Sequence, residues 1–223
     1  MARRWLHLGL LLLLAAALSR CFQAPSTELL DIRALDSTIV VELKYATSDN
    51  FVGQPLYGAN VCYLRRPTAE RLARVQQRLR AQGLGLKVYD CYRPLSVQWR
   101  MWELVPDTRY VADPRKGSRH NRGAAVDVTL VDTAGHELLM PSAFDDFSEK
   151  ASRSYAQAPP EALRHRALLE EAMTAEGFIP LASEWWHFDD PQWERYSVLD
   201  IPLEKLAGNQ RPPNETERKR EIR

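Results

Sequence analysis

Residues 117–128 of this chain are Gly117-Ser118-Arg119-His120-Asn121-Arg122-Gly123-Ala124-Ala125-Val126-Asp127-Val128. The first half has glycine at both ends and is typical of a loop. The second half alternates apolar and polar residues, which predicts a β-strand with Asp127 on the face opposite Val126 and Val128. A loop carrying His120 that leads into a strand carrying Asp127 can bring both side chains to one point.

The types of side chain gathered here indicate a hydrolytic zinc site. A catalytic zinc takes three nitrogen or oxygen donors from the protein and leaves one position for water. His120 and Asp127 provide two donors. A second segment downstream, Glu184-Trp185-Trp186-His187, provides another imidazole and a further carboxylate three residues before it. We therefore predict that His120, Asp127 and His187 hold one zinc ion per chain.

The other histidines of the chain do not compete for this role. The sequence has five in all. His7 lies in an N-terminal apolar segment, and His136 follows a turn glycine. His165 stands between two arginines on the outer face of a predicted helix, so each of the three is expected to lie away from the site.

A further short block, at 90–94, lies upstream of the two segments described so far. The three blocks follow one another in a defined order. They are Asp90-Cys91-Tyr92-Arg93-Pro94, Ser118-x-His120-x-x-Gly123-x-Ala125-x-Asp127 and Glu184-x-x-His187. Together they resemble the zinc D-alanyl-D-alanine dipeptidases of the vancomycin-resistance type, within the wider clan of zinc D,D-peptidases. The resemblance extends from about residue 30 to about residue 203.

This resemblance implies roles for individual residues. Zinc would bind His120, Asp127 and His187, Glu184 would be the catalytic base, and Arg93 would stabilise the transition state. The alternative for Arg93 is an ion pair at the surface, since the chain contains many arginines. Its position at a turn after a predicted strand, and the matching block, favour the catalytic role.

Substrate contacts are also implied by the family. An acidic residue near Phe144 is expected to help hold the free amino group of the substrate, and both Asp145 and Asp146 qualify. We assign this role to Asp145, which directly follows the phenylalanine. Ser118 is assigned to substrate binding as well. A dipeptide would then be held at both of its charged ends.

The expected function is zinc-dependent hydrolysis of the dipeptide D-Ala-D-Ala, in the turnover of dipeptide derived from the cell wall. One alternative is a D,D-carboxypeptidase or endopeptidase of the same clan that acts on peptidoglycan itself. The same zinc ligands would serve it, but capture of a free amine by Asp145 favours a dipeptide. A second alternative is a zinc-binding module without catalysis, against which the presence of Glu184 and Arg93 argues.

The fold class predicted for residues 25–207 is a single α+β domain, with a small antiparallel sheet and packed helices around one zinc site. Strands are expected at 37–45, 84–89 and 126–130, with a turn at 132–135 into another strand through 138 and 139. Helices are expected from an N-cap at Thr68 to Gly83, at 95–102, and from Pro160 to Gly177. An extended segment at 183–188 should deliver Glu184 and His187.

The ends of the chain indicate export. Two arginines precede an apolar run, 8–18, that is too short to span a bilayer comfortably, so residues 1–24 are predicted to be a signal peptide and the protein to be periplasmic or otherwise exported. A lipoprotein cleaved before Cys21 is the alternative. Removal of Arg3, Arg4 and Arg20 would change the formal charge from +1 to about −2. We expect no nucleic-acid partner and no membrane contact after cleavage unless Cys21 is lipidated. Residues 208–223 are predicted to be a disordered charged tail.

Cysteine usage leaves one question open. With Cys21 near the signal boundary, Cys62 and Cys91 remain in the predicted domain. An oxidising compartment would permit a disulfide between them, and two separate buried thiols are equally compatible with the sequence.

Overall fold

The structure, a computed structural model, describes residues 28–208. The predicted signal peptide lies outside this range, as does nearly all of the predicted tail. Along the chain the strands and α-helices are β1 (Leu29–Asp31), α2 (Ile32–Leu35), β2 (Val40–Val41), β3 (Tyr63–Arg65), α3 (Arg66–Arg80), β4 (Gly85–Asp90), α4 (Leu95–Leu104), β5 (Ala125–Val131), α5 (Pro160–Ala175), β6 (Ile179–Pro180), β7 (His187–Asp189) and α6 (Leu203–Gly208). Short 3₁₀ helices are η1 (Lys44–Ala46), η2 (His120–Arg122), η3 (Glu149–Ala151) and η4 (Trp193–Arg195). Within the described residues no helix is both long enough and apolar enough to cross a membrane.

The main sheet has five strands in the order β2-β4-β5-β7-β6. Strands β4, β5, β7 and β6 pair antiparallel, whereas β2 and β4 pair in parallel. The α+β fold class is confirmed, and the expectation of a purely antiparallel sheet is wrong at β2. Helix α3 lies in the connection from β2 to β4 and returns the chain to the same end of the sheet, as parallel neighbours require. A separate sheet is formed by β1 and β3, which pair antiparallel.

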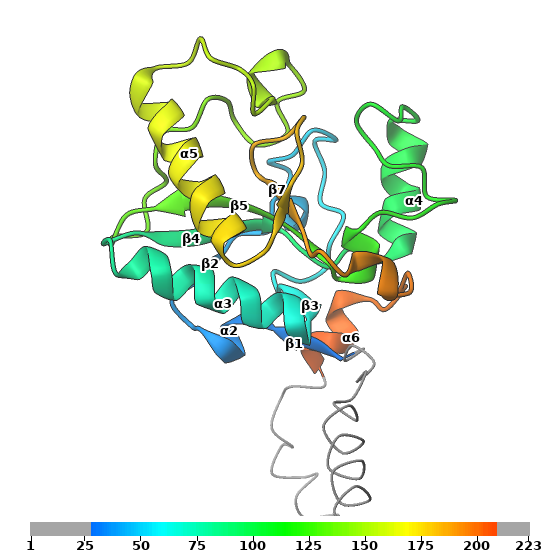
Figure 1. The fold of residues 1–223 in the computed structure, drawn as a ribbon. Helices are drawn as coiled ribbons and strands as arrows, with labels where there is room; N and C mark the ends of the chain where they lie inside the picture. The colour runs from blue at the N-terminus through cyan, green and yellow to red at the C-terminus, as the bar shows by residue number, and fades with distance from the viewer. Residues whose placement is uncertain (1–27, 209–223) are drawn as a thin grey trace, which may run out of the picture.

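Helices α3 and α5 contact each other and lie together on one side of the main sheet, whereas α4 stands apart from them (Figure 1). Both helices have the bounds expected from their apolar spacing to within a few residues. Their inward side chains are buried in one core with the valines of β5; from the helices these are Leu72, Val75, Leu79, Leu169, Ala172 and Met173. Because successive side chains of a strand alternate, the face of β5 that carries Asp127 is the opposite one.

Two predicted strands are shorter than expected. Of 37–45, only Val40–Val41 forms a strand, paired with Lys87 and Val88 of β4. The backbone N–H of Glu42 still donates to the carbonyl of Val88, 3.0 Å away. The chain then turns into η1, and the carbonyl of Tyr45 accepts hydrogen bonds from the backbone N–H groups of both Leu56 and Tyr57. The turn at 132–135 is present, but the strand expected beyond it is reduced to a single bridge between Val131 and Glu137.

The prediction that Thr68 caps a helix is wrong. Helix α3 begins at Arg66, directly after β3, and its N-cap is Arg65. Pro67 lies in the first turn, where its missing N–H leaves no hydrogen bond unmade. The hydroxyl of Thr68 instead donates to Oδ2 of Asp190, 2.9 Å away, and so joins α3 to the segment after β7.

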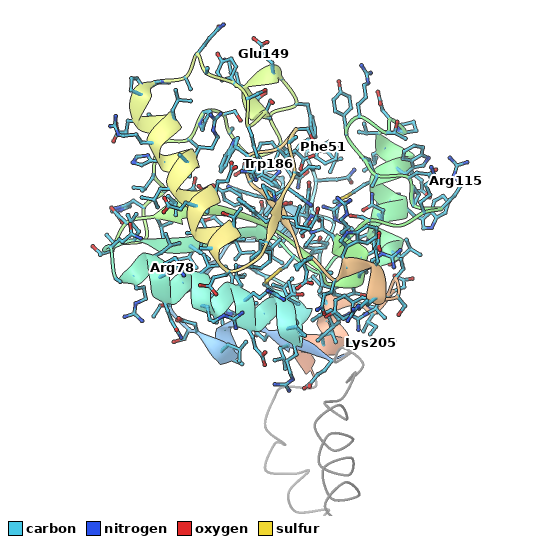
Figure 2. The ribbon with its side chains drawn as sticks, viewed as in Figure 1. Phe51, Arg78, Arg115, Glu149, Trp186 and Lys205 are labelled. Atoms are coloured by element: carbon cyan, nitrogen blue, oxygen red, sulfur yellow. A yellow bond between two sulfur atoms is a disulfide. The ribbon has the colours of Figure 1, made fainter. Side chains whose placement is uncertain are left out.

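Cys62 and Cys91 are joined by a disulfide, with their Cα atoms 5.7 Å apart. The bond connects the residue before β3 to the residue after β4. In Figure 2 the interior is filled with side chains, among them Trp186, whereas Arg78, Arg115, Glu149 and Lys205 point outward. Both cysteines are fully buried, so the disulfide is part of this interior.

Candidate metal centre

The segment before β5 bends because of a glycine. After η2, Gly123 adopts a φ of +66°, and its N–H donates to the carbonyl of His120. A Cβ at position 123 would lie 2.8 Å from Cδ2 of Leu29 and 3.4 Å from the backbone nitrogen of Arg65, so the backbone conformation and the space both favour glycine. This bend allows His120, at the start of η2, and Asp127, on β5, to face the same point.

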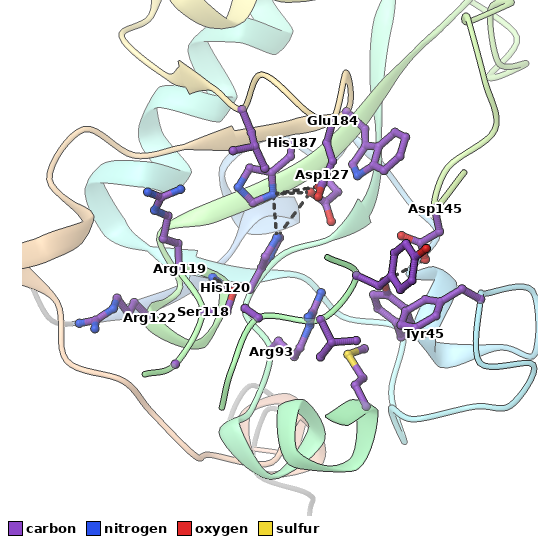
Figure 3. Close-up of a pocket in the computed structure, with 18 of the residues that line it drawn as sticks. Tyr45, Arg93, Ser118, Arg119, His120, Arg122, Asp127, Asp145, Glu184 and His187 are labelled. Carbon is purple, nitrogen blue, oxygen red and sulfur yellow. Dashed lines mark hydrogen bonds and ion pairs between the residues drawn. The ribbon is translucent and has the colours of Figure 1, made fainter. Parts of the chain in front are cut away.

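The second histidine comes from the neighbouring strand. In the antiparallel pair of β5 and β7, Asp127 lies opposite His187. Nδ1 of His187 is 2.9 Å from Oδ1 of Asp127 and 3.2 Å from Nε2 of His120. Nε2 of His120 is 3.5 Å from the same Asp127 oxygen, and Figure 3 shows the three side chains converging. The structure thus brings together all three residues that we predicted as ligands.

These separations fit a zinc ion. Tetrahedral ligands about 2.0–2.1 Å from zinc are roughly 3.3 Å from one another, close to the three observed distances. The outer ring nitrogens agree with this geometry. Nδ1 of His120 lies 2.7 Å from the carbonyl of Cys91, and Nε2 of His187 lies 2.9 Å from Oδ1 of Asp189. Both partners accept hydrogen bonds, so both outer nitrogens carry hydrogen, and a cation that displaces the inner proton of His187 would meet a lone pair on each inner nitrogen.

The charges around this point also favour a cation. Burial disfavours the ionised form of Asp127, but the two imidazoles outweigh it and hold the pKa of this carboxyl well below its usual range. Burial likewise disfavours a charged His187, but hydrogen bonds to Asp127 and Asp189 outweigh it and raise the pKa of His187 to about 10. The site therefore stabilises positive charge despite being buried.

Glu184 lies beside the ligand cluster but not on a strand. We expected an extended segment at 183–188, whereas β7 begins only at His187 and Glu184 lies in the turn before it. Oε2 of Glu184 is 3.9 Å from Nδ1 of His187. Burial raises the pKa of the Glu184 carboxyl. The guanidinium of Arg153 donates to the carbonyls of Leu181 and His187. These two hydrogen bonds hold both ends of this turn.

Arg93 is part of an ion pair that is buried rather than exposed. Its Nε and Nη2 lie 3.1 and 2.5 Å from Oδ2 of Asp90, and its Nη1 donates to Oε1 of Gln98 at 2.8 Å. Burial disfavours the charge, but Asp90 outweighs it and raises the pKa of Arg93 above its usual value. Arg93 as a whole is 8% exposed, and it lines the same pocket as the ligand cluster.

This pocket has a volume of about 430 Å³ and is lined by all seven of the residues we predicted for the site. Asp145, with a φ of +57°, accepts a hydrogen bond from the hydroxyl of Tyr45 at 2.9 Å, and burial raises the pKa of its carboxyl. Asp146 does not line the pocket; its side chain accepts from the backbone of Ser148. Ser118 lies on the other side of Arg93 from Asp145 (Figure 3), and its hydroxyl accepts from the N–H of His120.

Two aromatic side chains meet at the rim of this pocket. The rings of Tyr110 and Phe147 have centroids 4.6 Å apart, and each side chain is more than a third exposed. Both residues also line a neighbouring hollow of about 380 Å³, together with Glu184 and Trp186. The cleft therefore continues past the aromatic pair, beyond the pocket that holds the ligand cluster.

Asp189 and Tyr45, which contact predicted site residues, were not assigned roles from the sequence. Asp189 follows His187 by two residues on a strand, so the same alternation that placed Asp127 could have placed it. For Tyr45, the family resemblance places only its loop near the site, and the contact with Asp145 spans 100 positions of sequence, so no role could be assigned to the side chain. The remaining described histidines lie elsewhere, as predicted: His136 is exposed beside Asp132, and His165 contacts the carbonyl of Leu139.

Comparisons with known sequences agree on one family. The family described as D-ala-D-ala dipeptidase (Peptidase M15) matches residues 25–201. A D-alanyl-D-alanine dipeptidase of Escherichia coli strain K12 is 40% identical over 78% of this chain and 90% of its own length. A D-alanyl-D-alanine dipeptidase of Streptomyces coelicolor is 33% identical over 76% of this chain and 95% of its own. The solved structure of VanYB in complex with D-Alanine-D-Alanine has a TM-score of 0.40 at 16% identity, covering 70% of this chain and 88% of that chain.

Proposed function

Because the chain belongs to the D-ala-D-ala dipeptidase family, we propose that it is a zinc metallopeptidase that hydrolyses the dipeptide D-Ala-D-Ala. The observation that carries this proposal is the convergence, in one pocket, of three metal-ligand atoms, a carboxylate and a buried guanidinium. Together these groups can supply a metal, a general base and a stabiliser of negative charge, which suits metal-dependent peptide hydrolysis.

The residues that would hold the zinc are His120, Asp127 and His187, through Nε2, Oδ1 and Nδ1. A zinc ion held there would supply a Lewis acid and would lower the pKa of a bound water, so that hydroxide is available near neutral pH. The support for this assignment is the lone-pair geometry of the two imidazoles, since each outer nitrogen donates to a fixed acceptor. These acceptors hold both rings with their inner nitrogens directed at the place of the metal.

Glu184 is the proposed general base. Its carboxylate lines the pocket beside the ligand cluster, and its side chain is 30% exposed, so that it can reach a water molecule as well as the scissile bond. It takes a proton from the attacking water and returns a proton to the leaving amine. Its raised pKa brings it closer to neutrality, which suits a group that both accepts and donates.

Arg93 is proposed to meet the negative charge that develops on the carbonyl oxygen. Asp90 and Gln98 fix its guanidinium before substrate arrives, so little reorganisation is needed as the charge appears. The ion pair with Asp90 therefore does not compete with a catalytic role. It orients the cation.

The ends of the substrate are assigned to Asp145 and Ser118. Asp145 is an acidic group on one side of Arg93 and suits the ammonium of the dipeptide, whereas Ser118 lies on the other side and suits the carboxylate. Binding an ammonium would favour the ionised form of Asp145, against the effect of its burial. A zwitterionic dipeptide then spans the ligand cluster with its peptide bond near Glu184.

The test is an assay of the purified protein with D-Ala-D-Ala, with L-Ala-L-Ala and with a muramyl pentapeptide, each with and without a chelator. We expect hydrolysis of D-Ala-D-Ala only, loss of it with chelator, and recovery when zinc is restored. The cleft beyond Tyr110 and Phe147 is the reason for the pentapeptide arm. Cleavage of the pentapeptide in preference to the dipeptide would identify a D,D-carboxypeptidase, and no cleavage of either would refute the proposal.

We also propose that the protein is exported and acts on cell-wall-derived dipeptide outside the cytoplasm. The disulfide between Cys62 and Cys91 supports this proposal, because disulfides persist in oxidising compartments. The segment that would direct export, 1–24, lies outside the described residues. Mass spectrometry of the mature protein should find an N-terminus between residues 18 and 25. A diacylated Cys21 would favour the lipoprotein alternative, and an intact Met1 in a cytoplasmic fraction would exclude export.

A further inference from the structure

We infer that Asp189, held by Arg119, is a positioning residue that fixes the proposed metal ligand His187 and strengthens metal binding. The inference rests on the metal site proposed above and adds a side chain that does not touch the metal or the substrate.

The contact between Asp189 and His187 follows from the strand that carries both. They are two residues apart on β7, so their side chains lie on the same face. Oδ1 of Asp189 accepts from Nε2 of His187 at 2.9 Å, and the carboxylate is almost fully buried. This hydrogen bond orients the imidazole and leaves the lone pair of Nδ1 directed at Asp127 and His120.

Arg119 holds the second oxygen of this carboxylate. Its Nη1 donates to Oδ2 of Asp189 at 2.8 Å, and its guanidinium lies 4.7 Å from the ring centroid of Trp193. Arg119 directly precedes the ligand His120, whereas Asp189 follows the ligand His187. The ion pair therefore ties together, from outside the ligand cluster, the two segments that supply the imidazoles.

The two imidazoles differ in what holds their outer nitrogens. For His120 the acceptor is the backbone carbonyl of Cys91, which no side-chain substitution removes. For His187 the acceptor is a carboxylate, which makes the imidazole a stronger donor to a metal and can be substituted. Loss of such an outer partner typically lowers metal affinity by roughly 10- to 100-fold.

The experiment measures the dissociation constant of zinc by competition with a chromophoric chelator. We expect Asp189→Asn to raise it about 10- to 100-fold, because the amide is uncharged and leaves Arg119 without its partner. Arg119→Gln should raise it less, and Arg119→Lys should recover part of the loss, since lysine keeps the charge without the planar fork. Asp132→Asn is the matched control, because Asp132 also contacts an imidazole, that of His136, at a surface turn.

A second readout separates positioning from folding. The visible spectrum of the Co²⁺-substituted protein reports the geometry around the metal, and it should change in Asp189→Asn but not in Asp132→Asn. A zinc affinity in Asp189→Asn equal to that of the wild type would overturn the inference, as would an equal loss in Asp132→Asn. If Asp189→Asn does not fold, an unchanged affinity in Arg119→Gln overturns it alone. Zinc affinity is measured without substrate, so failure of the dipeptide assay is distinguishable from failure of this inference.

Discussion

Glu184 and Arg93 line one pocket, and the protein holds them very differently. The side chain of Glu184 is partly exposed and lies in a turn. The guanidinium of Arg93 is buried, and all three of its nitrogens donate hydrogen bonds, two to Asp90 and one to Gln98. A base that moves a proton twice needs some freedom. A cation that meets transient charge is most effective when it is already in place.

Glu184→Gln should retain zinc and lose activity, because the amide keeps the shape of the side chain but cannot accept the proton. General acid-base catalysis typically contributes roughly 10² to 10⁴ in rate, and we expect turnover to fall by at least that range. Elemental analysis and single-substrate kinetics on the same preparation provide the measurement. Near-normal turnover would assign the base to another residue.

Arg93→Ala should lower turnover by roughly 10² to 10³ with little change in KM, as expected for a group that acts on charge present only in the transition state. Arg93→Lys should recover part of the rate, because lysine keeps the charge but not the fork held by Asp90 and Gln98. Steady-state kinetics distinguish this from a substrate clamp. A raised KM with intact turnover would show that Arg93 binds the ground state instead.

The junction between η2 and β5 positions the first two predicted ligands, His120 and Asp127. The junction needs glycine at position 123, because the backbone there has a φ of +66°. Gly123→Ala should lower the free energy of unfolding by about 1–2 kcal/mol from the left-handed backbone, and further from the contact with Leu29. Gly83→Ala is the matched control, since Gly83 has a φ of +73° with nothing within 4 Å of a Cβ. Urea unfolding and zinc affinity should separate them, because only Gly123→Ala should weaken metal binding. Equal losses in both variants would mean that the contact has no effect.

Elements with sustained local patterns could be predicted from the sequence, and those defined by distant partners could not. The alternation in β5 and the spacing in α5 gave both elements nearly their observed bounds. Strand β2 is two residues long because only Val40 and Val41 are in register with β4. The sequence of 37–45 alone does not specify where that pairing stops. Thr68 is a suitable cap by residue type, but the chain enters the helix directly from β3.

The candidate site divides in the same way. His120 and His187 could be identified by residue type, spacing and elimination, and Asp127 by strand alternation. Choosing Asp145 over Asp146 rested on the neighbouring phenylalanine, whereas the physical difference between them is the contact of Asp145 with Tyr45. The pairing of Cys62 with Cys91 was undecidable, because a disulfide depends on a Cα separation that only the folded chain defines.

For the whole molecule, the disulfide should be a large part of the stability. The two cysteines are 29 positions apart in the sequence. For a loop of this length, the loss of chain entropy in the unfolded state stabilises the folded protein by about 3–4 kcal/mol. The double variant Cys62→Ala, Cys91→Ala should therefore unfold at a lower urea concentration than the oxidised wild type. The wild type under reducing conditions should do the same. A reducing agent should have no effect on the double variant. Equal stability of oxidised and reduced wild type would contradict this expectation.

The position of His187 opposite Asp127 also bears on when, during synthesis and folding, the complete set of predicted metal ligands is assembled. His120 and Asp127 precede α5, whereas His187 lies on β7, which the ribosome synthesises 60 residues after Asp127. A growing or partly folded chain can offer two ligands but not three, because the third arrives only when β7 docks between β5 and β6. We therefore expect metal loading to be a late step of maturation, and a protein translocated unfolded would then acquire its ion from the compartment where it finally folds.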